Sequence, residues 1–365
     1  MTTPDAGVHP VAHVPLAPLT TLGVGGAARW FVRARSIAEV VASHVWASHQ
    51  QVPLVVLGGG SNVVVADRGV DALVVHMGVT GVSFDPQGSV TRVWAGAGES
   101  WDGLVQQVVE RGLAGLECLS GIPGSVGGTP VQNVGAYGQE VARVIAEVQV
   151  YDRVEQREAT IPVEACGFGY RTSRFKGGDR DRFVVCGVTF EVRPGNGTAT
   201  YPDLVAELAA DAASATVARV RDAVLAVRRR KGMVLDPQDG DTRSVGSFFT
   251  NPVVMSAEVE RIEAAQAGQV PSYATETGRR KLSAAWLIEQ AGMTRGTTRG
   301  AVGLSGKHTL AIVNRGGATA SDVVRFAGEI KRRVLDRFGI WLTPEPVFVG
   351  FGDDPGVRWL EERGK

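Results

Sequence analysis

The alternation of apolar and polar residues predicts a first ordered segment over residues 28–75. Residues 30–33 alternate in the way that favours a strand, and Ser36 can cap a following helix. Two apolar runs, 52–57 and 63–65, then predict two more strands on either side of a glycine loop. The expected order is strand, helix, strand, strand.

A second segment is expected over residues 76–200. It contains a predicted strand at 92–95, a helix capped by Ser100, and a longer strand at 183–192. Between the helix and the longer strand lies LSGIPGSVGGTPVQNVGAYGQ, residues 119–139. This stretch is too rich in glycine for regular structure.

The pattern of the last part predicts mainly helices. Apolar residues at helical spacing predict helices at 216–231, 282–290 and 321–338, the last one capped by Ser321 and stopped by Gly339. A turn-prone linker, 232–245, is expected to form a surface loop, and a strand at 340–349 to lead into a polar tail. The predicted domains are 1–75, 76–200 and 201–350, followed by a C-terminal tail, 351–365.

Composition narrows the classes of partner. The 365 residues are enough for two or three cores, and 38 basic residues balance 38 acidic ones. No net field steers the protein toward nucleic acid or a membrane, so we expect small-molecule partners and, by default, a monomer. The 3 cysteines form no CxxC pair, and the 6 histidines have no zinc-ligand spacing. With neither a targeting segment nor a membrane span, a soluble cytoplasmic protein without a bound metal is expected.

Two glycine clusters compete for a phosphate-binding role. GVGGAA, residues 23–28, matches a dinucleotide fingerprint, but a proline-rich segment precedes it and a strand follows it, so a Rossmann site is disfavoured. LGGGSN, residues 57–62, could offer backbone N–H groups to a pyrophosphate or could be a tight β-hairpin turn. A second glycine loop, 121–138, tips the balance toward a buried cofactor that carries phosphate.

Ser247 stands in GSFFTNP, between a glycine and two phenylalanines. A serine hydroxyl is a weak acid, so as a proton donor it needs a partner as basic as a carbanion or an enolate. The alternative is an ordinary turn or N-cap serine. The residues around it do not decide between these two roles.

Seven motifs, in this order, resemble one family. They are VVLGGGSNVVVAD, IPGSVGGTPVQNVGAYG, CGFGYRTSRFK, TYPDL, GSFFTNP, KLSAAWLIEQAG and TPEPVFVG. Together they resemble the bacterial UDP-N-acetylenolpyruvoylglucosamine reductases, the MurB family, over roughly residues 18–350. The resemblance implies an α+β fold with a two-part FAD-binding domain of the PCMH, or vanillyl-alcohol-oxidase-like, type and a C-terminal α+β substrate domain. The tyrosine of TYPDL points to the subgroup with a tyrosine-bearing loop over the substrate.

The implied activity is a step of peptidoglycan precursor synthesis in the cytoplasm. NADPH would reduce FAD, and a hydride from flavin N5 would then reach the CH2 carbon of UDP-N-acetylglucosamine enolpyruvate. Ser247 would protonate the other alkene carbon, where its proximity matters more than its acidity. Arg171 and a protonated Glu345 would stabilise the enolate-like intermediate. The segment around Glu345 departs from some relatives at Thr343 and Pro346.

The resemblance also implies binding residues. The implied FAD contacts are Gly58, Gly59, Gly60, Ser61, Asn62, Ile122, Pro123, Gly127, Gly128, Asn133, Gly135 and Ala136. Tyr201, Lys231 and Asn251 match contacts to the UDP and sugar groups, and a monovalent cation such as K+ is implied near the site by family analogy. The role of His308 stays open.

The sequence also predicts whether nearby charged and aromatic residues are exposed or buried. A diphosphate would give at least one cation of the run 228–231 a reason to point inward, although such runs usually mark a solvated face. Arg174 and Lys176 are expected on the surface, and Phe248 and Phe249 in the core, where they would exclude water.

Two rival functions remain. A flavin oxidase of the same fold would use the same glycine loops, although neither loop contains a His or Cys for a covalent link to FAD. A non-catalytic UDP-sugar sensor would keep the fold without the chemistry. The joint presence of Arg171, Ser247 and Glu345 argues against the sensor, because a binding module needs no proton donor.

Overall fold

The computed structural model describes residues 7–266, 269–275 and 277–363, and the chain divides into two compact units. The first unit comprises Met1–Val14, Ala27–Gly60 and Asp71–Val234, and the second Pro15–Gly26, Ser61–Val70 and Leu235–Lys365. The predicted first domain begins, and the predicted tail ends, in residues outside the described ones, 1–6 and 364–365. The predicted boundaries at 75, 200 and 350 stay a prediction.

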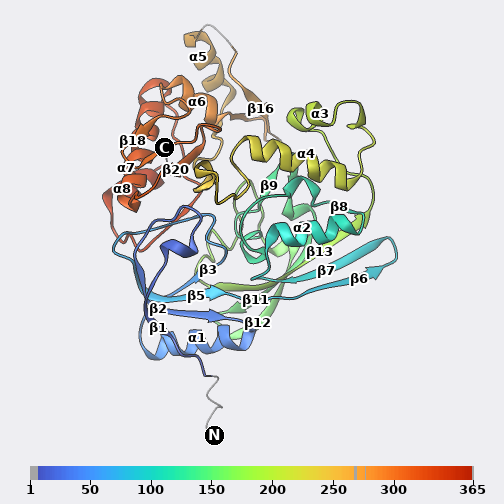
Figure 1. Cartoon of the computed structure of the whole chain (residues 1–365), viewed down its shortest axis with the longest axis vertical. Helices are drawn as coiled ribbons and strands as arrows, with labels where there is room; N and C mark the ends of the chain where they lie inside the picture. Colours follow the sequence, from blue (N-terminus) through green and yellow to red (C-terminus); the bar gives the residue numbers. More distant parts are fainter. Residues whose placement is uncertain (1–6, 267–268, 276, 364–365) are drawn as a thin grey trace. The chain divides into compact units, whose positions relative to one another are not determined.

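Among its described residues, the first unit contains two larger sheets, one small two-stranded sheet and four α-helices (Figure 1). One sheet has the order β1 (Val11–Pro15), β2 (Ala27–Ala34), β5 (Val70–Met77), β3 (Leu54–Leu57). The other has the order β12 (Arg157–Pro162), β11 (Ile145–Asp152), β13 (Phe183–Pro194), β7 (Val90–Gly96), β6 (Val82–Gln87), with β8 (Leu113–Ala114) also paired to β13. The helices are α1 (Ile37–His49), α2 (Trp101–Glu110), α3 (Pro202–Leu208) and α4 (Val217–Arg230).

Local capping explains where the first two helices begin. The hydroxyl of Ser36 accepts the N–H of Glu39 at the start of α1, and that of Ser100 accepts the N–H of Gly103 at the start of α2. Both predicted caps are confirmed. Helix α1 runs along the sheet that contains β1 and β2 in Figure 1, and its His44 ring also lies 5.5 Å from that of Tyr151 in β11.

The glycine-rich stretch at 119–139 is mostly irregular, as predicted. Its regular structure includes a 3-10 turn, Val126–Gly128, and the strand β9 (Gly135–Ala136). Strand β9 forms a small hairpin with β10 (Gln139–Glu140), which begins at the last residue of the stretch. At the tip of this hairpin, Tyr137 has φ +48° and Gly138 has φ +87°. Two consecutive positive φ values are those of a type I′ turn, which matches the twist of a two-residue hairpin.

In its described residues, the second unit contains three small sheets and four α-helices. Its sheets have the orders β14 (Ser244–Ser247), β20 (Ala311–Asn314), β19 (Val302–Leu304), β18 (Thr298–Arg299); β15 (Val253–Val254), β17 (Arg280–Leu282), β16 (Ser272–Ala274); and β21 (Val347–Val349), β4 (Val63–Val65). Its helices are α5 (Ser256–Gln266), α6 (Ala284–Gln290), α7 (Ala320–Phe338) and α8 (Pro355–Glu361). Helix α7 packs on β19 and β20 and against α6 and α8 around one apolar core.

Strand pairing excludes one interpretation of residues 57–62. Strand β3 pairs in parallel with β5, and β4 pairs in parallel with β21. The strands on either side of the loop therefore do not form a hairpin, and the hairpin-turn alternative is wrong.

Two predicted helix starts are corrected by capping. Helix α7 begins at Ala320 and is capped by Thr319, which forms a capping box with Asp322, so Ser321 is not the cap. It ends before Gly339, at φ +71°, as predicted. Helix α6 begins two residues later than predicted, because Ser283 is its cap and Leu282 belongs to β17.

The region after residue 340 differs from the prediction. Among the described residues of this region, 341–363, only Val347–Val349 is a strand. Pro344 and Pro346 lack the N–H that a sheet ladder requires, which explains why the predicted strand is shorter. The predicted polar tail contains α8, whose last carbonyls accept three hydrogen bonds from the fully buried ammonium of Lys331, at 2.6–2.9 Å.

Candidate active site

The two glycine loops of the first unit lie against each other. The N–H of Gly59 donates to the Ser125 hydroxyl at 3.3 Å. A Cβ on Gly58 would lie 2.6 Å from the Ser125 Oγ, and one on Gly59 would lie 2.7 Å from the Gly124 Cα. These positions must be glycine for the loops to approach this closely. The segments that the sequence singled out separately therefore form one surface, which includes half-buried Ile122 and Pro123.

Arg171 is held against the second of these loops. Its Nη2 donates to the Gly135 carbonyl at 2.6 Å and its Nη1 to the Asn133 carbonyl at 3.4 Å. The side chain of Asn133 is buried and bonds to Glu140, to the Gly169 carbonyl and to the N–H of Ala142. The Asn133 side chain thus ties the loop that carries Gly135 to the segment of Gly169, just before Arg171.

Tyr201 and Lys231 meet at an aromatic residue that was not predicted. The ring of Tyr137 lies 5.5 Å from that of Tyr201 in an edge-on arrangement, and the Lys231 Nζ lies 5.8 Å from the Tyr137 centroid. Lys231 also pairs with Asp203 at 2.5 Å. Burial raises the pKa of the Tyr137 hydroxyl, so this hydroxyl stays protonated at neutral pH.

The run 228–231 is mixed in orientation. Arg229 and Arg230 are exposed, and Arg230 pairs with Glu207 at 2.5 Å. Arg228 is directed inward: it donates to the Met233 carbonyl at 2.8 Å, and desolvation lowers the pKa of its guanidinium. Its Nε is buried and has no hydrogen-bond partner among the described residues. At least one cation of this run was expected to point inward if a diphosphate binds, and Arg228 points inward.

In the second unit, Ser247 ends a strand that is interrupted just before it. Strand β14 pairs with β20, and its register shifts between Ser244 and Ser247. Gly246 takes φ +73° at the shift, an irregularity that redirects the following side chain. Ser247 is half-buried and lies in a strand, so the turn or N-cap alternative does not describe it. The rings of Phe248 and Phe249 are buried beside it, as predicted.

Glu345 lies on the backbone segment next to that of Ser247. The N–H of Glu345 donates to the Phe248 carbonyl at 2.8 Å, and Thr250 donates to the Thr343 carbonyl at 3.0 Å. Asn62, which follows Ser61, donates from its side chain to the Glu345 carbonyl at 3.4 Å and accepts the N–H of Val347 at 3.0 Å. The second unit thus brings Ser247, Glu345 and Asn62 onto neighbouring segments.

Asn251 and His308, both considered in the sequence analysis, form hydrogen bonds within the second unit. The Asn251 side-chain oxygen accepts the N–H of Ala284 at 2.9 Å and so fixes the start of α6. His308 lies in the turn between β19 and β20, where its N–H donates to the Ser305 hydroxyl at 3.2 Å. Arg174 and Lys176, both expected on the surface, are half-buried, and Arg174 pairs with Asp179 at 2.7 Å.

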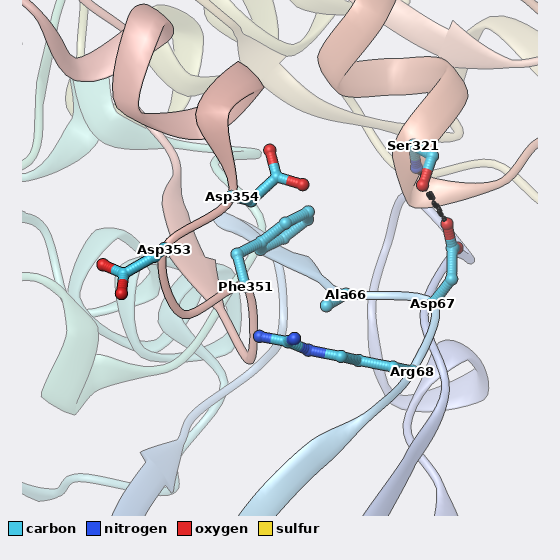
Figure 2. Close-up of a pocket in the computed structure, with 7 residues that line it drawn as sticks. All are labelled: Ala66, Asp67, Arg68, Ser321, Phe351, Asp353 and Asp354. Carbon is cyan, nitrogen blue, oxygen red and sulfur yellow. Dashed lines mark hydrogen bonds between the residues drawn. The ribbon is translucent and has the colours of Figure 1, made fainter.

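A cavity of about 500 Å³ in the second unit contains none of the predicted residues. Figure 2 shows the Asp67 carboxylate pointing at Ser321 and the Arg68 side chain extending beneath Phe351. The lining residues are Ala66, Asp67, Arg68, Ser321, Phe351, Asp353 and Asp354. Asp67 bonds to the N–H groups of Ala320 and Ser321 at 2.6 and 2.9 Å, and Asp354 caps α8, so two of its three carboxylates already serve helix ends.

Comparison with known proteins assigns the family. The UDP-N-acetylenolpyruvoylglucosamine reductase C-terminal domain matches residues 236–349, and an FAD binding domain matches residues 28–155. The reductase of that name from Thermobifida fusca is 47% identical over 350 residues, which cover 93% of this chain and 97% of the relative. The Streptomyces avermitilis reductase is 44% identical over 353 residues, 94% of this chain and 96% of the relative. This chain belongs to the MurB family.

A solved structure supports the assignment at the level of the fold. The MurB crystal structure from Thermus caldophilus aligns with a TM-score of 0.65 at 27% identity, covering 94% of this chain and 100% of that one. The predicted MurB fold, an FAD-binding domain of the PCMH type with the family's C-terminal domain in an α+β chain, is confirmed.

The glycine loops of this MurB chain fit FAD. A Cβ on Gly127 would lie 2.6 Å from the Ala97 Cβ, whereas one on Gly128 would meet nothing within 4 Å. Gly58 and Gly59 therefore pack the two loops together, Gly127 packs the second loop against Ala97, and Gly128 presents bare backbone to open space. Residues 58–60 and 124–128 carry no charged side chain that would repel a diphosphate. Gly60, at φ +63°, completes the first loop.

Across the described ranges, no set of three or more His, Cys, Asp or Glu side chains is grouped to hold a metal ion. No helix in the described part of the chain is long and apolar enough to cross a membrane. Cys118, Cys166 and Cys186 are buried free thiols, and burial raises their pKa values to about 12, 11 and 12.

Three residues of this neighbourhood were missed by sequence reasoning. Tyr137 had a visible signal, because a lone aromatic residue between glycines in GAYG has no core-packing pattern. Arg228 could not be told apart from its three basic neighbours. Glu117, a fully buried carboxylate that accepts the N–H of Thr198 at 2.9 Å, had no signal, because that contact spans 81 positions in the chain.

Proposed function

We propose that this chain reduces UDP-N-acetylglucosamine enolpyruvate to UDP-N-acetylmuramate with NADPH as the reductant and FAD as the cofactor, in peptidoglycan precursor synthesis in the cytoplasm. The observation that carries the proposal is the 47% identity that spans 93% of the chain. Similarity extends through both the FAD-binding part and the C-terminal domain. An FAD-binding module that had lost the substrate domain would match the FAD-binding domain alone.

Bound FAD would supply the redox step, taking a hydride from NADPH and passing it to the CH2 carbon of the enolpyruvyl group. The chain would hold it through backbone groups of the loops at 58–60 and 124–128. No side-chain charge is needed there, because N–H groups turned toward a diphosphate bind it well. The remaining steps concern the substrate and fall to the side chains.

Ser247 would donate the proton. Hydride addition at the CH2 carbon leaves negative charge on the neighbouring carbon and its carboxylate, and this carbanion is far more basic than water. A nearby hydroxyl can therefore protonate it despite a high pKa. The half-buried position of Ser247 beside two buried phenylalanines would limit competing water.

Arg171 and Glu345 would stabilise that charge. A guanidinium held by two backbone carbonyls is oriented before substrate arrives, so little reorganisation is needed when charge develops. Glu345 would assist in its protonated form, as a hydrogen-bond donor to the developing enolate.

Tyr201, Lys231 and Asn251 would bind the UDP and sugar groups. The pair of Lys231 and Asp203 is partly exposed, so an incoming diphosphate can compete for the ammonium. Tyr201, 36% exposed, stands at the start of α3, which supports assignment to the subgroup with a tyrosine-bearing loop. We extend the proposal to a monovalent cation such as K+ by family analogy, and to a monomer as the working state.

Product analysis tests this proposal. The FAD-loaded protein is incubated with NADPH and the enolpyruvyl substrate, and the sugar nucleotide is then examined by mass spectrometry. The proposal predicts a gain of two hydrogens per NADPH consumed. NADPH consumption matched by oxygen uptake, with the substrate recovered unchanged, would establish the oxidase instead. A protein that binds the sugar nucleotide but consumes no NADPH would be a sensor.

A further inference from the structure

A fully buried carboxylate lies just before the second glycine loop. Glu117 is 0% exposed. Its Oε2 accepts the N–H of Gly115 at 2.7 Å, and its Oε1 accepts both the Gln139 Nε2 at 2.8 Å and the N–H of Thr198 at 2.9 Å. Burying a charge costs free energy unless donors surround it, and these three bonds meet that requirement.

Two of the three donors belong to segments that carry tyrosines of the candidate site. Gln139 directly follows the turn of Tyr137 and Gly138, and Thr198 lies three residues before Tyr201. Both segments are held a second time from the residue after Glu117. The N–H of Cys118 donates to the Gln139 Oε1 at 2.8 Å, and its thiol donates to the Thr198 carbonyl at 3.1 Å.

The Tyr137 turn needs such support. A non-glycine residue at φ +48° is strained, and such a conformation persists only where the surroundings impose it. The Tyr137 and Tyr201 rings meet edge-on at 84°, so a small shift of either segment would separate them. Thr200 adjoins the turn as well, since a Cβ on Gly138 would lie 3.3 Å from its Oγ1.

We propose that Glu117 is a positioning residue, which through Gln139 and Thr198 sets the spacing of Tyr137 and Tyr201 and so shapes the surface that binds the UDP group. This inference rests on the proposed function. The carboxylate is required because all three partners are donors. An amide at this position would turn its own NH2 toward at least one N–H and leave that group unpaired.

The isosteric variant Glu117→Gln tests the proposal, with Glu158→Gln, on the exposed part of β12, as the matched control. We expect the KM for the enolpyruvyl substrate to rise about tenfold or more, as one lost hydrogen bond to a charged group predicts. The kcat and the FAD content should stay close to those of the control, although the melting temperature should fall modestly because one buried N–H is left unpaired. UDP binding, measured by calorimetry, should weaken by the same factor.

A second variant keeps the test decisive if Glu117→Gln does not fold. Gln139→Met removes the amide that links Glu117 to the Tyr137 turn and fills nearly the same volume, and it should raise the same KM. The double variant Glu117→Gln with Gln139→Glu restores one donor–acceptor pair and should recover part of the affinity for UDP.

Two outcomes overturn the inference. One is an unchanged KM and UDP affinity in a folded Glu117→Gln protein, and the other is a loss of kcat and FAD in step with stability, which marks a purely structural role. Failure of the proposed function is separate: it appears as a wild-type protein that does not convert the enolpyruvyl substrate, whereas the comparison of UDP binding can still be made.

Discussion

At the scale of single residues, unusual backbone conformations adjoin the side chains that we assign to chemistry. Arg171 has φ +54° and Tyr137 φ +48°, and Gly246 takes φ +73° next to Ser247. Non-glycine residues rarely adopt positive φ, and such strain persists only where neighbours impose it. The side chain of Arg171 is held by two backbone carbonyls. The turn of Tyr137 is held by Gln139, whose side chain donates to Glu117. Strain and proposed function therefore coincide at these positions.

Replacing Ser247 by alanine tests the proton donor. The strand should remain, because Ser247 is half-buried and alanine fits the same position. Reoxidation of the reduced flavin by the enolpyruvyl substrate should slow by about 10²–10⁴, the usual contribution of a general acid. Reduction by NADPH should be unchanged in stopped-flow measurements. Ser48→Ala, on the exposed side of α1, is the control, and equal reoxidation rates in the two variants would refute the assignment.

At the scale of elements, the sequence predicts what is local and misses what is distant. The helices after Ser36 and Ser100 and the stop at Gly339 are set by groups within four residues, so they were read correctly. The partner of β4 is β21, which lies 284 positions further along the chain, and no local pattern indicates that pairing. The same distance hid the hydrogen bond from Asn62 to Glu345.

The glycine loops allow a matched pair of substitutions. A Cβ on Gly128 or on Gly178 meets no protein atom within 4 Å, so alanine should be tolerated by the fold at both positions. If Gly128 presents its backbone to FAD, Gly128→Ala should weaken FAD binding by at least about tenfold, or 1.4 kcal/mol, while Gly178→Ala should not. Equal FAD affinities, measured by flavin fluorescence during titration of the apoprotein, would remove Gly128 from the cofactor site.

At the scale of the whole molecule, the roles of site residues were inferable mainly through resemblance. Composition and charge excluded classes of partner, but no spacing in the chain indicates that Arg171 meets Gly135 or that Glu345 adjoins Phe248. Those contacts depend on folding of segments far apart in sequence. The chemistry of the surrounding residues alone did not decide the role of Ser247. The order of the seven motifs indicated a family, and with it the substrate that Ser247 would protonate.

Acid stability of the first unit should depend on Asp152. This carboxylate is 3% exposed and pairs with Arg182 through two nitrogens, at 2.7 and 3.0 Å, and that bonding lowers its pKa to about 2. Because the unfolded value is near 3.8, its contribution to stability is complete above about pH 4 and is lost as pH falls through 2.

Urea unfolding of Asp152→Asn measures that contribution. The variant should be less stable than the wild type at pH 7, and the difference should shrink toward pH 2. Asp71→Asn is the control, because the Asp71 side chain is 83% exposed and its pair with Arg29 should contribute little. A difference that is the same at both pH values would show that Asp152 acts by packing and not by charge.

The central claim is that one protein couples NADPH oxidation to reduction of an enolpyruvyl ether. Its most direct test is to follow the flavin absorbance of the purified protein without oxygen, first on adding NADPH and then on adding UDP-N-acetylglucosamine enolpyruvate. Our account predicts that NADPH bleaches the flavin and that only the enolpyruvyl substrate restores its colour. A flavin that stays bleached with this substrate and recovers when air is admitted would contradict it.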